Sequence, residues 1–216
     1  MMKKLMRKIH RGQRGITGLE TAIILIAFVV VASVFAYTVL SAGIFSSQKG
    51  QEAIYSGLQQ TRSTLELKGG VIAKDTDSNG YIDQITFTVA NALGGEPIDF
   101  TEPTAAGTDT GLAAANSNNV VVISYIDKDQ RAEDLYWSIT KLGNCDSDDL
   151  LEDDEKFQIT IGGASAGSGP GNLEDALSTD LGTNRTFTIE VKTPNGATLN
   201  IERTTPAYID TVLNLD

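Results

Sequence analysis

Arg14-Gly15-Ile16-Thr17-Gly18-Leu19-Glu20 joins a short basic leader to a long apolar segment, and this junction decides the fold. From Thr21 to Phe45 there are 25 residues without a charge, against the roughly 20 apolar residues that a helix needs to cross a bilayer. The run is far longer than a strand, and in lipid every backbone group must bond within its own segment. The sequence therefore predicts a helix that can span a membrane.

The leader before this helix carries only positive charge. Such segments stay on the cytoplasmic side of a membrane, so the chain beyond the helix is predicted to be extracellular. Before any assembly, the helix would lie in the membrane. The six basic residues of the leader are Lys3, Lys4, Arg7, Lys8, Arg11 and Arg14.

Two positions for removal of the leader are open. An ordinary secretory signal is cut after its apolar region, and Ser41-Ala42-Gly43 offers small residues there. The alternative is a cut between Gly15 and Ile16, which leaves the helix on the mature chain. Glu20 is then the only charge before Lys49, and a carboxylate so close to an apolar helix needs a cation. The new α-amino group at Ile16, of this chain or of a neighbour, would supply that cation.

Three glycines favour close packing of the helix against other helices. Gly43, Gly50 and Gly57 recur every seven residues and so follow one side of a helix, where neighbouring backbones can approach closely. The alternative is that each glycine only weakens the helix, by about 1 kcal/mol.

The helix is predicted to continue to Leu67, because apolar residues keep a three- and four-residue spacing between polar ones. Lys68-Gly69-Gly70 is predicted to end it. A helix from about Thr17 would then be roughly 75 Å long. No single globular core covers that length, so its partners are predicted to be other chains.

Arg14-Gly15-Ile16-Thr17-Gly18-Leu19-Glu20-Thr21-Ala22-Ile23, with the apolar helix that follows, closely resembles the N-terminus of archaellins, the archaeal flagellins. These proteins share a class III leader and N-terminal helix with type IV pilins. The resemblance covers about residues 1–65. Many pilins begin with Phe or Met where Ile16 would stand, which favours archaellins.

This resemblance implies a division into a cleaved leader (1–15), a helix that forms a filament core (16–68) and an outer domain (70–216). It implies cleavage after Gly15 by a prepilin-peptidase-like enzyme, with Glu20 at the mature fifth position. Its expected partners are other copies, in a homopolymer or mixed archaellin filament, and the archaellum assembly and motor machinery. The implied function is a structural subunit of the archaellum filament that supports swimming. A type IV pilin-like adhesion filament and a membrane-anchored monomer remain alternatives.

After Val71 the apolar period changes from helical to alternating, which predicts strands. Pro194-Asn195-Gly196 is the strongest hairpin signal, and the glycine-rich segment 162–171 is predicted to be a flexible surface loop. One helical turn is predicted at Leu173 to Leu177. The fold class is therefore α+β, with a long N-terminal helix and an antiparallel β-sandwich or barrel-like outer domain. The predicted strands are 82–89, 120–126, 135–139, 157–161, 187–191 and 199–201.

A half-match to a calcium-binding loop follows the helix. Asp75, Asp77, Asn79 and Asp83 offer oxygen atoms at the spacing of the first nine positions of an EF-hand loop, and Gly80 allows the sharp bend. The twelfth position is a threonine, not a bidentate glutamate. A structural Ca²⁺ ion is one interpretation, and a turn whose side chains cap their own backbone is the other.

Other chemistry is sparse. Asn184-Arg185-Thr186 is an N-glycosylation sequon, and a single cysteine, Cys145, cannot form an internal disulfide. The only histidine, His10, lies in the leader, so the mature chain lacks the commonest general base. We predict that the protein is not an enzyme and requires no cofactor.

The net charge points away from nucleic acid. The chain has 17 basic and 28 acidic residues and a net charge of −11. Without the six basic leader residues, 11 basic and 28 acidic residues remain, which gives −17. Phosphate binding needs clustered Lys and Arg, whereas a strongly acidic surface keeps an extracellular protein soluble.

Overall fold

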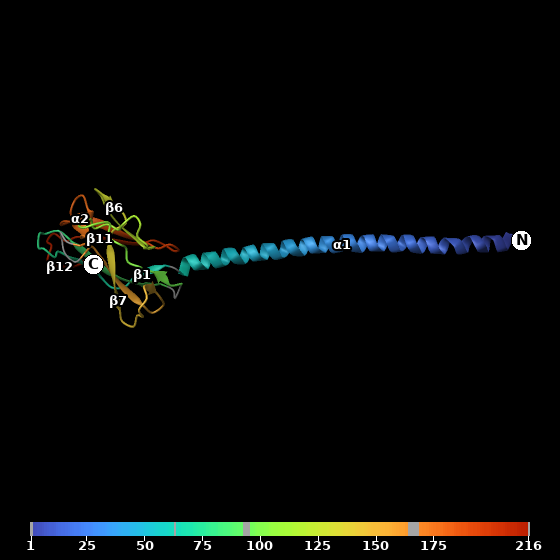
Figure 1. Ribbon diagram of the computed structural model, residues 1–216, viewed down its shortest axis with the longest axis horizontal. Helices are drawn as coiled ribbons and strands as arrows, with labels where there is room; N and C mark the ends of the chain where they lie inside the picture. Colours follow the sequence, from blue (N-terminus) through green and yellow to red (C-terminus); the bar gives the residue numbers. More distant parts are fainter. Residues whose placement is uncertain (1, 63, 93–95, 164–168, 216) are drawn as a thin grey trace. The chain divides into compact units, whose positions relative to one another are not determined.

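The computed structural model describes residues 2–62, 64–92, 96–163 and 169–215, without the side chains of 2–17 and 59–62. The chain divides into two compact units, Met1–Tyr55 and Ser56–Asp216. The first belongs to the long helix α1 and the second contains the strands (Figure 1). Each unit is described by itself.

Helix α1 (Met2–Arg62) is continuous through the leader and the apolar run. No proline interrupts it, which agrees with the predicted long helix. The predicted end at residue 68 is wrong, because strand β1 (Leu65–Leu67) follows the helix.

The physical reason lies in β1 itself. Leu65 is only 4% exposed, and β1 pairs antiparallel with β3 (Gln84–Asn91). The backbone N–H of Lys68 then donates to the carbonyl of Thr88 at 2.8 Å. A sheet partner and a buried leucine outweigh the helical spacing that the sequence showed, so the β unit begins before the predicted residue 70.

The described residues of the β unit form three antiparallel sheets. The largest has the strand order β12-β2-β3-β9-β7, with β1 also paired to β3. The second has the order β11-β10-β5-β6, and β4 and β8 form a two-stranded sheet. The remaining elements are β2 (Val71–Lys74), β4 (Ile98–Asp99), β5 (Val122–Asp127), β6 (Arg131–Ala132), β7 (Trp137–Leu142), β8 (Leu150–Leu151), β9 (Lys156–Ile161), α2 (Leu173–Ala176), β10 (Thr186–Lys192), β11 (Leu199–Thr204) and β12 (Val212–Leu215).

One hydrophobic core joins the two larger sheets. Alternate residues of β9 and β10 point into it, as their period-2 burial shows. Phe100 meets Trp137 and Phe157 edge to face, with ring centroids 5.9 Å apart in each pair. The core includes inward side chains of β3, β9, β5 and β10 together, which confirms the predicted long helix followed by antiparallel sheets.

The hairpin at the C-terminal end is confirmed in register. Ile189 lies opposite Ile201 and Val191 opposite Leu199. The short helix α2 also stands where a single turn was predicted.

The prediction of a flexible surface loop at 162–171 is wrong at both of its ends. Gly162, Gly163 and Gly171 are buried, and the N–H of Gly163 donates to the carbonyl of Gly171 at 2.6 Å. The centre of this loop, 164–168, lies outside the described residues. Glycine serves here for close backbone contact, because a Cβ on Gly171 would lie 2.5 Å from the nitrogen of Gly111.

Candidate functional site

Helix α1 presents a row of exposed apolar side chains. The segment Gly18–Leu58 is long and apolar enough to cross a membrane. Phe28 is 74% exposed and Phe35 is 70% exposed. Large exposed apolar surfaces mark sites of interaction with another protein or a membrane.

The polar side chains within the apolar run bond to their own helix. The hydroxyl of Ser33 donates to the carbonyl of Val29 at 2.6 Å, and that of Thr38 donates to the carbonyl of Phe35 at 2.8 Å. These hydroxyls therefore need no external partner in lipid or in a bundle of helices.

The predicted assembly residues all lie on α1. Glu20 is exposed, and a Cβ on Gly43, Gly50 or Gly57 would meet nothing within 4 Å beyond its chain neighbours and the nearby backbone of its own helix. Open space on one side of the helix leaves room for a neighbouring backbone, so close packing at these glycines stays a prediction.

The predicted cleavage residues, Gly15 and Ile16, lie within the helical backbone of α1. The side chain of Ile16 is outside the described part.

The second candidate site is the loop between β2 and β3. Carboxylate oxygens of Asp75, Asp77 and Asp83 lie within 4.8 Å of one another. Asp75 is 3% exposed and Asp83 is fully buried. The N–H groups of Ser78 and Gly80 donate to the two oxygens of Asp75 at 2.6 and 2.9 Å. Backbone donors thus hold the carboxylate in place.

The fourth predicted residue, Asn79, does not belong to the cluster of carboxylates formed by Asp75, Asp77 and Asp83. Its amide nitrogen donates to Asp77 at 3.1 Å and to Glu174 at 2.9 Å. Its amide oxygen accepts from the N–H of Tyr81 at 2.8 Å. Asn79 therefore links the loop to helix α2.

Helix α2 brings two residues to this loop that the sequence pattern missed. The side-chain nitrogen of Asn172 donates to Asp83 at 3.3 Å, and Asn172 also caps α2. Burial raises the pKa of Glu174, and so do the charges of Asp83 and Asp77, although the hydrogen bond from Asn79 opposes them. The negative charge of the loop therefore disfavours ionisation of Glu174.

This donor set fits a hard divalent cation. Ca²⁺ takes six to eight oxygen ligands, mostly carboxylates and carbonyls, and the loop gathers three aspartates with Glu174 nearby. Thr86, the twelfth position of the loop pattern, lies in β3 opposite Ile72. The twelfth position therefore provides no carboxylate, and the carboxylate of Glu174 in α2 lies beside the loop instead.

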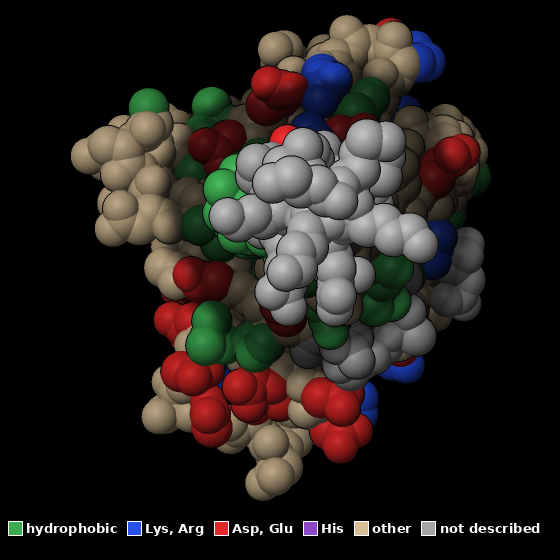
Figure 2. Space-filling model, turned by 90° about the vertical axis from the view of Figure 1, so that its right-hand side faces the viewer, with side chains coloured by type: hydrophobic (Ala, Val, Ile, Leu, Met, Phe, Trp, Pro, Cys, Tyr) green, Lys and Arg blue, Asp and Glu red, His purple; other side chains and the backbone are tan. Residues whose placement is uncertain are grey.

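The acidic segment 146–155, which follows β7, is distinct from the loop between β2 and β3. Acidic side chains gather along the lower edge of the face in Figure 2, where basic ones are few. Within the segment, the buried carboxylate of Glu155 accepts the N–H of Asp146 at 3.0 Å and that of Glu152 at 3.1 Å. Cys145 is half-buried and packs against the core, as a small structural side chain would. Glu155 thus shapes the segment through backbone contacts.

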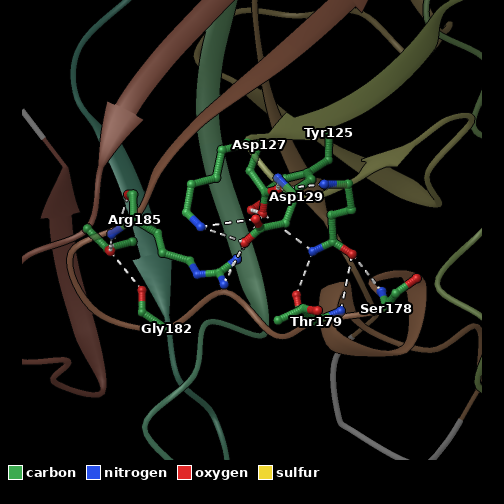
Figure 3. A network of polar contacts seen from close by, with 10 residues as sticks. Tyr125, Asp127, Asp129, Ser178, Thr179, Gly182 and Arg185 are labelled. Carbon is green, nitrogen blue, oxygen red and sulfur yellow. Dashed lines mark hydrogen bonds and ion pairs between the residues drawn. The ribbon is translucent and has the colours of Figure 1, made fainter.

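A partly buried polar network holds the turn that carries the sequon (Figure 3). The hydroxyl of Tyr125 donates to Asp127 at 2.9 Å, and Arg185 lies 3.3 Å from Asp127 and 2.9 Å from Asp129. Asn184 precedes Arg185, is exposed and has a φ of 52°. Its N–H donates to the carbonyl of Pro206 at 3.1 Å. The network therefore fixes the turn and leaves the sequon accessible.

Asp127 carries its negative charge in the folded state. Burial alone would raise the pKa of Asp127, but hydrogen bonds from the N–H of Asp129, the hydroxyl of Tyr125 and Gln130 outweigh it, so the pKa lies below its ordinary value. Burial raises the pKa of Tyr125 far above its ordinary value, so the phenol stays neutral and donates.

We expect Asp127→Asn to destabilise the β unit by about 1.5–3 kcal/mol at pH 7, because hydrogen bonds to a charged group are lost. The lowered pKa of Asp127 stabilises the fold above the unfolded value near 4, and that contribution disappears as the pH falls through the folded value. The difference between variant and wild type should therefore shrink below about pH 4. Urea unfolding of the variant and the wild type at pH 7 and below about pH 4 measures this difference in the free energy of unfolding.

Asp129→Asn is the control, because the side chain of Asp129 is 39% exposed and exposed ion pairs contribute less than about 1 kcal/mol. An equal loss in both variants would contradict the role given to buried Asp127.

Comparisons with known proteins agree with one another. The profile of the archaeal-type flagellin family matches residues 15–203. A probable flagellin 1 from Archaeoglobus fulgidus is 38% identical over 210 residues, which cover 95% of this chain and 96% of the relative. The archaeal flagellum of Methanospirillum hungatei strain JF1 superposes with a TM-score of 0.59 at 27% identity, covering 92% of this chain and 98% of that chain.

A further solved structure shares the fold alone. The crystal structure of archaeal flagellin FlaB1 from Methanocaldococcus jannaschii superposes with a TM-score of 0.50 at 14% identity, over 70% of this chain and 95% of that chain.

Proposed function

We propose, since the chain belongs to the archaeal-type flagellin family, that it is a structural subunit of the archaellum filament and supports swimming. The observation that carries this function is the apolar helix Gly18–Leu58, which is long and apolar enough to cross a membrane and whose large apolar side chains are exposed. Copies of the same helix would cover it. The relatives reported above are flagellins, which favours a swimming filament over an adhesion filament.

Assembly would transfer the helix from lipid to a bundle of like helices. Hydrophobicity alone does not favour that transfer, because lipid is as apolar as the bundle. Close packing at Gly43, Gly50 and Gly57 and the pairing of Glu20 with the Ile16 amine would supply the preference. A membrane-inserted precursor and the archaellum assembly and motor machinery are the partners that this route needs.

Leader removal by a prepilin-peptidase-like enzyme would create that amine. Hydrolysis adds one water across the Gly15–Ile16 bond, so the hydroxyl joins the carbonyl carbon of Gly15 and a proton goes to the nitrogen of Ile16. The chain that remains begins with a charged amine four residues before Glu20.

The function is tested by deleting the gene in its host and restoring it. The deletion strain should lose surface filaments and swimming while attachment is unchanged, and the restored gene should return both. Loss of attachment with normal swimming would favour the adhesion filament instead.

The loop at Asp75 would hold one Ca²⁺ ion as a structural element. The cation would balance Asp75, Asp77 and Asp83 and would draw in Glu174, which joins the β2–β3 loop to α2. The proposal is supported by the buried carboxylates and their spacing. Asn184 is proposed as a glycan attachment site on its accessible turn.

We expect Ca²⁺ to raise the melting temperature of the isolated unit 56–216. At 100 times the dissociation constant, a ligand specific for the folded state adds about 2.7 kcal/mol, which is roughly 5–10 °C for a unit of this size. Calorimetry with added Ca²⁺ and then with chelator measures the shift. The isolated unit should begin before β1, because β1 belongs to its largest sheet.

Matched variants assign the shift to the loop. Asp77→Asn should remove most of it, and Glu174→Gln should reduce it. Asp148→Asn, in the acidic segment after β7, should leave it unchanged. An identical melting temperature with Ca²⁺ and with chelator would remove the calcium proposal.

A further inference from the structure

The β unit contains two Asn-Gly pairs in connections between strands. Asn79-Gly80 lies between β2 and β3, and Asn195-Gly196 lies between β10 and β11. Both asparagines are exposed to solvent, and glycine has no Cβ to shield its own backbone nitrogen. The two pairs therefore share the sequence and the accessibility that spontaneous deamidation of asparagine needs.

This reaction needs a free backbone amide and a free side-chain amide. The backbone nitrogen of the glycine loses its proton and bonds to Cγ of the asparagine, and ammonia leaves as a succinimide ring closes. One water then opens the ring at either of its carbonyl carbons and gives aspartate or isoaspartate. The net change is one water in and one ammonia out, so neither an oxidant nor a reductant takes part.

The first pair is held in place at both reacting groups. The N–H of Gly80 donates to the carboxylate of Asp75 at 2.9 Å, and a negative charge so close opposes loss of the proton. The amide nitrogen of Asn79 donates to Glu174 at 2.9 Å, and its amide oxygen accepts from the N–H of Tyr81 at 2.8 Å. Attack of the Gly80 nitrogen on Cγ of Asn79 would have to break these hydrogen bonds.

The second pair is held at neither group. Among the residues that the structure describes, the side chain of Asn195 and the N–H of Gly196 make no hydrogen bond. The pairing between β10 and β11 ends at Val191 and Leu199. Residues 193–198 lie outside this pairing, so they can rearrange without breaking it.

We propose that Asn195 is a site of spontaneous deamidation in the folded chain and that the contacts of Asn79 protect it from the same reaction. Aspartate at position 195 adds a negative charge to the turn, and isoaspartate adds a carbon atom to its backbone. Because water is the only co-reactant, the modified fraction grows with the age of the chain. The proposal does not depend on assembly into a filament.

The test incubates the full-length chain, purified in detergent, in mildly alkaline buffer and follows the peptides that contain the two asparagines by mass spectrometry. Deamidation should be at least about tenfold faster at Asn195 than at Asn79, because breaking a hydrogen bond to a charged group raises the barrier. An isoaspartyl methyltransferase with a labelled methyl donor should mark the peptide that contains residue 195.

Unfolding separates the effect of the fold from that of the local sequence. In guanidinium chloride the contacts of Asn79 are lost, so both asparagines should react at similar rates. The variant Asn195→Gln should remove the labelled peptide, because the longer side chain of glutamine does not close a succinimide ring.

Equal rates at Asn79 and Asn195 in the folded chain would overturn the proposal. It would also fail if Asn195 reacted only in the unfolded chain. A tenfold difference that persisted in guanidinium chloride would show that neighbouring sequence protects Asn79, and would overturn the role given to its contacts.

Discussion

Replacing Glu20 by Val is expected to reduce filament yield by more than about tenfold and to leave the processed chain in the membrane. In the assembled helix bundle, Glu20 would pair with the α-amino group of Ile16. Removing one partner of a buried ion pair leaves the other charge uncompensated and costs about 3–5 kcal/mol. The measurement is the amount of this chain in sheared, sedimented filaments relative to the membrane fraction.

Glu52→Gln is the matched control, because Glu52 is another acidic residue of α1 and its pair with Lys49 is exposed. Exposed pairs contribute less than about 1 kcal/mol, so filament yield should stay near normal. Glu20→Asp keeps the charge and should retain more filament than Glu20→Val. Normal filament amounts from Glu20→Val would show that the proposed amine pairing is wrong.

Replacing Gly171 by Ala is expected to destabilise the β unit by roughly 2–5 kcal/mol, the sum of left-handed strain and overpacking. Gly171 has a φ of +83°, and its Cβ would lie 2.5 Å from the nitrogen of Gly111 and 2.7 Å from that of Thr110. Both contacts are with backbone, which cannot rotate away. Urea unfolding of the 56–216 unit measures the loss.

Gly143→Ala separates the two contributions. Gly143 has a φ of +81°, but a Cβ there would meet nothing within 4 Å, so only the strain of about 1–2 kcal/mol applies. If the two variants lost equal stability, close packing between Gly171 and Gly111 would contribute nothing. Because Gly171 precedes Asn172, Gly171→Ala should also weaken the Ca²⁺ response.

The features set by local sequence were predictable. The apolar run from Thr21 to Phe45 dictates a helix through its length alone, and Pro194-Asn195-Gly196 dictates a hairpin through turn chemistry. Both are present. The Asp75 loop was visible as well, because its oxygen donors follow one another at fixed spacing.

The features set by contacts between distant residues were not predictable. Leu65 continues a helical spacing, and only the partner strand β3 makes it part of a strand. Glu174 lies 95 positions from Asn79 along the chain, so no spacing rule connects them. A helical turn was predicted at Leu173 to Leu177, but a helix prediction gives no location beside a distant loop.

Burial likewise had no local signature at Gly162, Gly163 and Gly171. Glycines in a row are typical of flexible linkers, and they are equally typical of backbones in close contact. Only the approach of Gly111, from a different part of the chain, distinguishes the two.

The central claim is that the chain loses its leader, keeps its helix and polymerises. The most direct test is the intact mass and N-terminal sequence of the chain in filaments sheared from the cell surface. We predict a start at Ile16, with any glycan seen as excess mass on the peptide that contains Asn184. A start near Gly43, or an uncut chain that stays in the membrane fraction, would contradict the filament account.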